Sequence, residues 1–390
     1  MPWKECSVLD QRTEFALKSL GGGIVFGELC REFGISRKTG YKWRERFVAK
    51  GLGGLYEESR RPDRSPGSLS ERVVCQIVRL KNAHPHWGPH KLRTVYLRRH
   101  SQGPSESSFK RVLDRAGLVK HRRKRRASPG QRLTTEVVAN APNDVWTVDF
   151  KGWWKMLGGG RCEPLTIRDL HSRYVLAVEA MESTCGVDVQ AAFERVFQAN
   201  GLPKVILSDN GPPFALSHSL LGLTRLSAWW IALGIRLHRI RPASPQENGS
   251  HERMHRDIST ELQGQIDGGK AQHQAAFDTW RDEYNWERPH EALEMKVPGD
   301  IYRKSKHKWP GKTPEITYGP GYLSRRVTTN GTIKLHGHTI ALSRALAGHN
   351  VGLTYQQHNG FDVWFDYLRL GTIDLNTEAF VPTDKGTSTA

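Results

Sequence analysis

The chain has 390 residues, more than one hydrophobic core usually serves, so two to four domains are expected. Lys and Arg number 58 against 40 for Asp and Glu, giving a net charge of +18 and a pI near 9.8. This excess favours a polyanionic partner such as DNA, because each neutralised phosphate releases counterions. A membrane surface would attract the same charge, but no run of about 18 apolar residues is present to span a bilayer, so no membrane partner is expected.

The first residues and the cysteines indicate the compartment. The start of the chain lacks an apolar stretch of the signal-peptide type. The five cysteines are scattered and odd in number, which argues against a disulfide framework and a Cys-based zinc site. A cytoplasmic protein is therefore expected.

Residues 1–58 are predicted to form a first helix-turn-helix domain. Helical patterns at 12–20 and 25–33 precede a tight turn that ends at Ser36, a suitable N-cap for a basic helix. The cationic side chains of that helix are suited to contact DNA phosphates and base edges. The DNA-contacting candidates are Arg37, Lys38, Lys42 and Arg44. The alternative, a solvated amphipathic helix that partly buries Tyr41, Trp43 and Phe47, is less favoured.

Two linkers flank a second unit of the same kind. Residues 59–68 are rich in Pro and charge; Arg60 and Arg61 could enter a minor groove, and a plain solvated linker is an equal alternative. Three helical patterns predict a second helix-turn-helix domain at 69–119. A basic linker at 120–142 follows, whose candidate backbone contacts are Arg122, Arg123 and Arg125. A merely solubilising role is less favoured, because this linker joins two folded segments.

Residues 143–303 change to a pattern of strands and helices. Three strand-like runs lie within 145–181, and a helix, a short buried strand, a helix, a strand and a helix follow. The order β-β-β-α-β-α-β-α is that of a ribonuclease-H-like fold. The whole chain is thus predicted to be multidomain α/β, with a mixed central sheet and flanking helices.

Three acids stand out in this central segment. Asp149 lies in an apolar strand, where a carboxylate is unfavourable unless it is paired or binds a metal. Asp209 follows a short buried strand, at the end where sheets commonly bind ligands. Glu252 lies in the first turn of a helix and is assigned to the polar face with His255, Arg256 and Ser259, opposite Met254, Ile258 and Leu262.

The three carboxylates together predict a metal site. They supply hard oxygen ligands and leave positions for water and phosphate, which suits two Mg²⁺ ions, or Mn²⁺, in an in-line displacement. Each acid alone has a simpler explanation: a strand edge, a turn and a surface pair with Arg256. Arg256 is otherwise a candidate phosphate contact one turn beyond Glu252.

These motifs resemble those of the DDE transposases of the retroviral-integrase superfamily, and most closely bacterial insertion-sequence transposases. The resemblance spans nearly the whole chain. Its carriers are Val148-Asp149, Ser208-Asp209-Asn210-Gly211 with Phe214, Pro245-Gln246-x-Asn248-Gly249-x-x-Glu252-Arg253, and Tyr284-Asn285-x-x-Arg288-Pro289-His290 with Pro298 and Tyr302. It implies that Asp149, Asp209 and Glu252 are the metal-binding catalytic triad. It also implies a bacterial protein that associates with the nucleoid when bound to DNA and forms a homo-oligomer in the active complex.

Two nearby acids are ranked below the triad. Asp169 falls at a hairpin, where a turn role is preferred, and Glu247 lies in the loop before the helix. The spacing from Asp209 to Glu252 is 43 residues (252 − 209), longer than is common in the superfamily, and a lengthened loop and helix at 216–230 is expected to absorb the excess. No His-His-Cys-Cys zinc module is present in the sequence. Arg288 and His290 are interpreted as a structural clamp in preference to phosphate contacts.

The C-terminal part reads as a separate domain. Residues 304–320 form a basic linker, and short strands separated by Gly and Asn turns at 321–376 predict a small β-barrel. A disordered tail is expected at 377–390. The resulting hypothesis is a DNA transposase that binds terminal inverted repeats, hydrolyses 3′ ends and transfers strands. The alternatives are a ribonuclease-H-type nuclease without strand joining and a domesticated DNA-binding protein with an inactive core.

Overall fold

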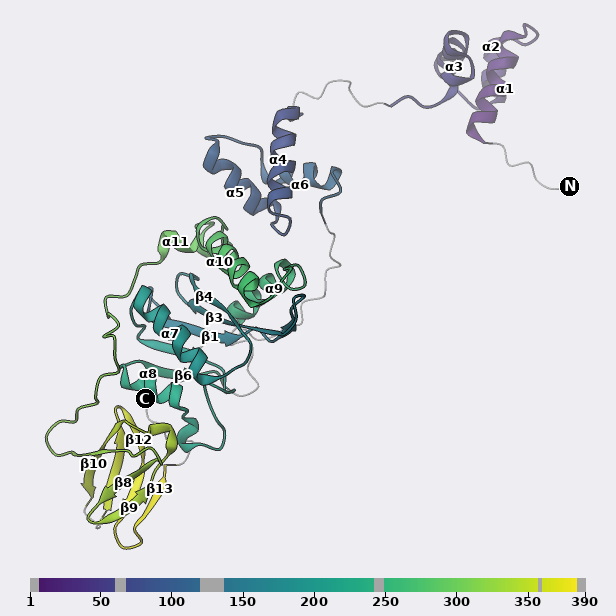
Figure 1. Ribbon diagram of the computed structural model, residues 1–390. Helices are drawn as coiled ribbons and strands as arrows, with labels where there is room; N and C mark the ends of the chain where they lie inside the picture. Colours follow the sequence, from purple (N-terminus) through teal and green to yellow (C-terminus); the bar gives the residue numbers. More distant parts are fainter. Residues whose placement is uncertain (1–6, 60–67, 120–136, 242–248, 357–359, 384–390) are drawn as a thin grey trace. The chain divides into compact units, whose positions relative to one another are not determined.

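A computed structural model describes residues 7–59, 68–119, 137–241, 249–356 and 360–383 (Figure 1). The chain divides into two compact units, Met1–Ser70 and Glu71–Ala390, which are described separately. The predicted DNA contacts Arg60, Arg61, Arg122, Arg123 and Arg125 lie outside the described residues, as does Glu247.

The first unit is a three-helix domain. It contains α1 (Val8–Leu20), α2 (Phe26–Glu32), α3 (Arg37–Lys50) and the 3₁₀ helix η1 (Gly51–Leu55). The predicted N-cap is confirmed, because the Ser36 side chain accepts a hydrogen bond from the Thr39 amide at 3.1 Å. The helices enclose a small core made of Phe15, Ala16, Leu29, Cys30, Trp43 and Leu55.

The second unit begins with the second predicted three-helix segment. It consists of α4 (Glu71–Ala83), α5 (Pro89–Arg99) and α6 (Glu106–Arg115). Pro89 occupies the first turn of α5, and the Ser105 side chain caps α6. Fully or nearly fully buried side chains join the helices: Ile77, Leu92, Tyr96, Phe109 and Leu113.

A mixed sheet forms the centre of the second unit, and the predicted order of elements is confirmed except that four strands, not three, lie within 145–181. The strands are β1 (Val145–Phe150), β2 (Trp154–Lys155), β3 (Arg161–Asp169), β4 (Val175–Met181), β5 (Val205–Ser208) and β6 (Arg236–Arg239). Strand β3 pairs antiparallel with β1, β2 and β4, whereas β1, β5 and β6 run parallel to one another. The carboxyl ends of β1 and β5 therefore lie side by side.

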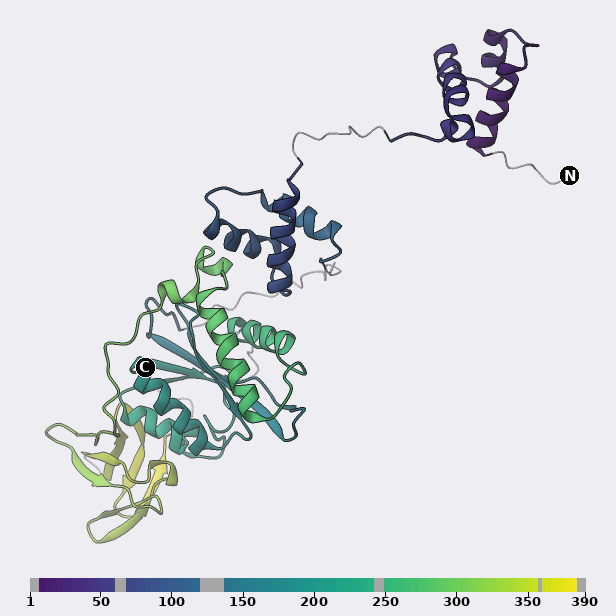
Figure 2. The same ribbon diagram turned by 45° about the horizontal axis from the view of Figure 1, so that its top comes forward.

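Helices cover both faces of this sheet (Figure 2). On one face, α7 (Gly186–Asn200) and α8 (Arg225–Ala232) pack on Trp146, Val148 and Ile206. On the other face, α9 (Gly249–Glu261) and α10 (Lys270–Trp286) pack on side chains of β2, β3 and β4. The central sheet is thus the middle layer of three.

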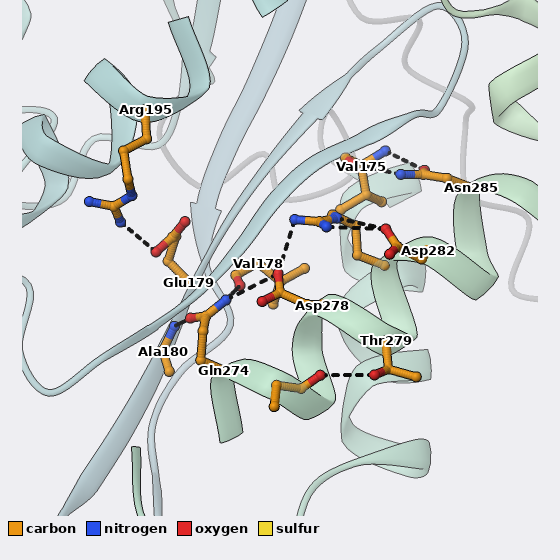
Figure 3. A network of polar contacts seen from close by, with 12 residues as sticks. Val175, Val178, Glu179, Ala180, Arg195, Gln274, Asp278, Thr279, Asp282 and Asn285 are labelled. Carbon is orange, nitrogen blue, oxygen red and sulfur yellow. Dashed lines mark hydrogen bonds and ion pairs between the residues drawn. The ribbon is translucent and has the colours of Figure 1, made fainter. Parts of the chain in front are cut away.

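Helix α10 is fastened to the edge strand β4 by side-chain amides (Figure 3). Asn285 accepts from the Val175 amide and donates to the Val175 carbonyl, both at 2.8 Å. Gln274 accepts from the Ala180 amide at 2.9 Å and donates to the Val178 carbonyl at 3.0 Å. These bonds satisfy backbone groups that an edge strand would otherwise expose to another chain.

The C-terminal strands form an open sheet, so the predicted closed barrel is wrong. The strands are β7 (Leu323–Arg326), β8 (Thr332–Leu335), β9 (His338–Ala341), β10 (Asn350–Gln356), β11 (Gly360–Phe365), β12 (Leu368–Asp374) and β13 (Ala379–Pro382). Five of them pair in the order β13-β12-β11-β10-β7, and β8 pairs only with β9. Within the described residues, side chains of the β8–β9 hairpin close the core in place of a ladder between β7 and β13.

The C-terminal sheet shares a hydrophobic core with α8. Leu223, Ala228 and Ile231 belong to the same buried cluster as the sheet residues Val351, Val363 and Ile373. The preceding segment contains η4 (Glu291–Leu293) and α11 (Pro298–Ile301), and η5 (Arg344–Leu346) precedes β10. Trp309, in the predicted linker, packs on Trp229 and Phe197. No described helix has both the length and the apolar character needed to cross a membrane.

Candidate active site

Asp149 lies near the carboxyl end of β1, with a side chain that is 22% exposed. Its pKa is raised from 3.8 to about 7. Burial is the largest cause, and the negative charges of Asp209 and Glu252 raise the pKa further. The structure therefore brings all three predicted acids within electrostatic reach of one another.

Asp209 follows β5, the parallel neighbour of β1. Thr147 is paired with Leu207, so continuing this register by two residues places Asp149 level with Asp209. Burial raises the pKa of Asp209, while a 3.2 Å hydrogen bond from the Gly211 amide to Oδ1 opposes that rise. The parallel register of β1 and β5 thus aligns the two aspartates at the same end of the sheet.

Glu252 lies in the first turn of α9 and is exposed. Anionic side chains are favourable in the first turn, because the unpaired amides carry partial positive charge there. Arg256, one turn further along, is also exposed.

The three acids share one end of the sheet without forming a closed ligand shell. Among the residues that the structure describes, no three His, Cys, Asp or Glu side chains are grouped closely enough to hold a metal ion. The donor chemistry nevertheless fits a hard divalent cation, since oxygen ligands suit such ions and a cation would relieve the repulsion that raises the pKa of Asp149.

The assignment of His255 to the polar face of α9 is wrong. His255 is 9% exposed and His251 is fully buried, and both imidazoles point toward β1 and β3. Burial is the main reason that the pKa of His255 falls to about 3 and that of His251 falls well below its usual value. His251 was missed in the sequence, where the i, i+4 spacing of the two histidines was the available signal.

The secondary assignments of nearby residues are confirmed. Asp169 is buried in a turn, where Oδ1 accepts from the Ser172 amide at 2.7 Å and Oδ2 accepts from the Asn143 amide at 2.7 Å. Arg288 is a structural clamp that is 2% exposed and pairs with Asp257 at 3.1 Å and Glu261 at 2.5 Å. The clamp holds α9 against the end of α10.

The predicted DNA contacts on α3 form a cationic surface. Arg37, Lys38 and Lys42 are exposed, and Arg44 is half-buried. The Lys42 ammonium lies 4.5 Å from the centroid of the buried Trp43 ring. Trp43 is buried, Phe47 is half-buried and Tyr41 stacks on Phe26 while remaining 49% exposed, as expected for an amphipathic helix, and the cations remain available to solvent. DNA contact by this helix stays a prediction.

Models of known families match successive parts of the chain. Models of the integrase core domain match residues 139–245 and 233–298. Models of a helix-turn-helix domain and a homeodomain-like domain match 11–63 and 39–113. A model of the C-terminal domain of IS481 family transposases matches 323–380.

Similar proteins come from insertion elements and retroviruses. An uncharacterized 31.7 kDa protein of insertion element IS407 from Burkholderia multivorans is 26% identical over 65% of this chain and 87% of that protein. An IS476 protein from Xanthomonas euvesicatoria is 26% identical over 64% of this chain and 70% of that protein. The Gag-Pol polyprotein of baboon endogenous virus is 34% identical over 32% of this chain and 7% of that protein.

Solved structures of retroviral integrases are also similar. The catalytic core domain of HTLV-2 integrase in complex with magnesium is 16% identical, with a TM-score of 0.32, over 43% of this chain and 100% of that chain. The corresponding domain of BIV integrase is 22% identical, with a TM-score of 0.32, over 41% of this chain and 93% of that chain.

An integrase core joined to DNA-binding helix-turn-helix domains defines a polynucleotidyl transferase of DNA recombination. With the C-terminal domain of IS481 family transposases and the similarity to insertion-element proteins, these matches support an insertion-sequence transposase of the DDE type.

Proposed function

We propose that this transposase binds the terminal inverted repeats of its own element, hydrolyses the DNA ends to expose 3′-hydroxyls and joins these ends to target DNA. Asp149, Asp209 and Glu252 would hold two Mg²⁺ ions, which Mn²⁺ would replace. The observation that carries the site assignment is the parallel pairing of β1 and β5, which brings Asp149 and Asp209 to one end of the sheet. Burial raises the pKa of Asp149 most, and the charges of Asp209 and Glu252 add to that rise. The charges of Asp209 and Glu252 both disfavour ionised Asp149, and a bound cation would offset that repulsion.

The bound ions would supply activation of the attacking oxygen and stabilisation of the leaving oxygen. The chain's own part is to place the ligands. Strands β1 and β5 fix Asp149 and Asp209 through their paired backbones, and α9 carries Glu252. Arg256 is exposed one turn beyond Glu252 and would bind a phosphate of the DNA backbone.

The DNA would be recognised mainly by the N-terminal domains. The exposed cations of α3, namely Arg37, Lys38 and Lys42, together with Arg44, would contact phosphates and base edges. Arg60, Arg61, Arg122, Arg123 and Arg125 would add backbone contacts from outside the described residues. The active complex would be a homo-oligomer on DNA, in the bacterial cytoplasm and at the nucleoid.

A joining assay tests this function. Labelled element ends, a target plasmid and Mg²⁺ are incubated with the wild type, Asp209→Asn or Glu252→Gln. We expect joined products from the wild type only, with at least a hundredfold loss in both variants. Cleavage without joining would favour a ribonuclease-H-type nuclease, and binding without either reaction would favour a DNA-binding regulator. Full joining by either variant would contradict the site assignment.

Glu247→Gln is the matched control for Glu252→Gln, because Glu247 is a glutamate five residues before Glu252 in the segment that leads to α9. It should retain joining. An inactive Glu247 variant beside an active Glu252 variant would reverse the choice of ligand.

A further inference from the structure

Two histidines of α9 meet two threonines of the sheet beneath the candidate metal site. His251 and Thr166 are fully buried, Thr147 is 1% exposed and His255 is 9% exposed. Thr166 Oγ1 lies 2.6 Å from His251 Nε2 and 2.8 Å from His255 Nε2. Thr147 Oγ1 lies 2.9 Å from His251 Nδ1. None of these four residues is a predicted metal ligand.

The number of protons on each side chain determines which atom donates in each hydrogen bond. The Thr166 hydroxyl donates its one proton to the Asp149 carbonyl at 3.0 Å, because a carbonyl oxygen can only accept. Both imidazoles must then donate to Thr166 from Nε2–H, which uses the two lone pairs of its oxygen. His251 Nδ1 can then accept from the Thr147 hydroxyl at 2.9 Å, a closer partner for that hydroxyl than the Arg168 carbonyl at 3.4 Å. In this scheme the Thr166 hydroxyl, both nitrogens of His251 and Nε2 of His255 each have a hydrogen-bond partner.

The network links the proposed metal ligands to the sheet. His251 immediately precedes Glu252, and His255 follows it by three residues, about one helical turn. Thr166 lies opposite Asp149 in the β1–β3 ladder and bonds to its backbone carbonyl. His255 Nδ1 also faces Asp149 Oδ2 at 3.9 Å. The first turn of α9 is therefore tied to the strand position that carries Asp149.

We propose that His251 and His255, which meet the Thr166 hydroxyl through Nε2, are positioning residues that set Glu252 against Asp149 for metal binding. This inference rests on the proposed function, because it assumes that the two acids bind the ion. Removing a residue that orients a metal ligand through hydrogen bonds typically lowers metal affinity by about 10- to 100-fold. A merely structural role would change stability and leave metal affinity unaltered.

The matched pair Thr166→Ser and Thr166→Val tests the network. Serine keeps the hydroxyl, whereas valine keeps the shape and removes it. In the full-length protein, Mn²⁺ binding is titrated by electron paramagnetic resonance, and thermal unfolding is followed in parallel. We expect Thr166→Val to weaken Mn²⁺ binding about tenfold or more and Thr166→Ser to stay within about twofold of the wild type. Equal Mn²⁺ affinity in both variants would overturn the proposal.

If Thr166→Val does not fold, the pair His255→Gln and His255→Leu carries the same test, since glutamine keeps a side-chain N–H donor. Histidine-selective ¹⁵N labelling of the metal-free protein provides a readout that needs no activity. It should show neutral Nε2–H tautomers for both rings, assigned with the His255 variants and His251→Gln; an Nδ1–H tautomer at either ring would contradict the assigned bonds.

The Asp209→Asn variant separates this inference from the proposed function. Unchanged Mn²⁺ binding in Asp209→Asn would show that the metal site itself is misplaced. Lost binding in Asp209→Asn together with unchanged binding in Thr166→Val would remove only the positioning role.

Discussion

Replacing Asp149 with asparagine should stabilise the metal-free fold at high pH, although it removes a proposed metal ligand. The folded-state pKa of Asp149 is about 7, against 3.8 for an unperturbed aspartate. The folded protein therefore binds this proton more tightly than the unfolded chain does. The stabilising effect of the proton is complete below about pH 4 and is lost as the pH rises through 7. The difference amounts to at most about 4 kcal/mol above pH 8.

The measurement is denaturant unfolding of the full-length protein in EDTA at pH 8 and pH 5. Tryptophan fluorescence reports on the central core, because Trp146 and Trp230 are buried there. We expect Asp149→Asn to exceed the wild type by up to about 4 kcal/mol at pH 8 and by less than about 2 kcal/mol at pH 5. Added Mg²⁺ should reduce the difference at pH 8 by stabilising the wild type.

Asp144→Asn is the matched control, because Lys204 and backbone amides hold the pKa of Asp144 below its usual value. Its stabilising effect is present above the unfolded pKa and is lost as the pH falls, so this variant should be less stable than the wild type at pH 8. If Asp149→Asn unfolds at the same or a lower denaturant concentration than the wild type at pH 8, the folded state does not raise the pKa of Asp149.

Two further changes test the DNA-reading helix and the clamp. Lys42→Ala should weaken binding to element ends and reduce the salt slope of log K by about 0.9, the value for one lost phosphate contact. Fluorescence anisotropy across a salt series measures both the affinity and the salt slope. The control Lys50→Ala removes a lysine paired with Glu58 and should have the smaller effect. An unchanged slope for Lys42→Ala would disfavour α3 as the DNA-contacting helix. Arg288→Ala should destabilise the central core by about 3–5 kcal/mol, because two carboxylates of α9 lose their buried partner. Arg281→Ala, at a more exposed pair, should cost about 1 kcal/mol or less in the same unfolding assay, and equal losses would reject the clamp.

The order of elements could be predicted because local patterns determine it. The alternation in β1 and the apolar run before Asp209 identify strands by composition alone. Ser36 and Pro89 similarly mark helix starts, since both residue types suit the first positions of a helix. The two aspartates could then be placed at one sheet edge, because parallel neighbouring strands align their carboxyl ends.

The burial of His255 could not be predicted in the same way. A histidine near Glu252 and Arg256 looks like part of a polar face, and its burial becomes favourable only because β3 brings Thr166 opposite it as a hydrogen-bond partner. The barrel failed for a related reason. Strand lengths and turns identify strands, whereas closure depends on whether the edge strands reach each other in space, and here the β8–β9 hairpin fills that position.

The long interval between Asp209 and Glu252 has a structural explanation. The 3₁₀ helix η2 (Leu220–Gly222) lies within it, and Arg239 of β6 donates hydrogen bonds to the carbonyls of Leu221 at 2.8 Å and Gly222 at 3.1 Å. Leu223, at the end of this segment, is buried in the cluster shared with the C-terminal sheet. The added residues therefore form an ordered support for the C-terminal domain between β5 and α8. The order of this segment is consistent with Glu252, at the start of α9, as the proposed third ligand.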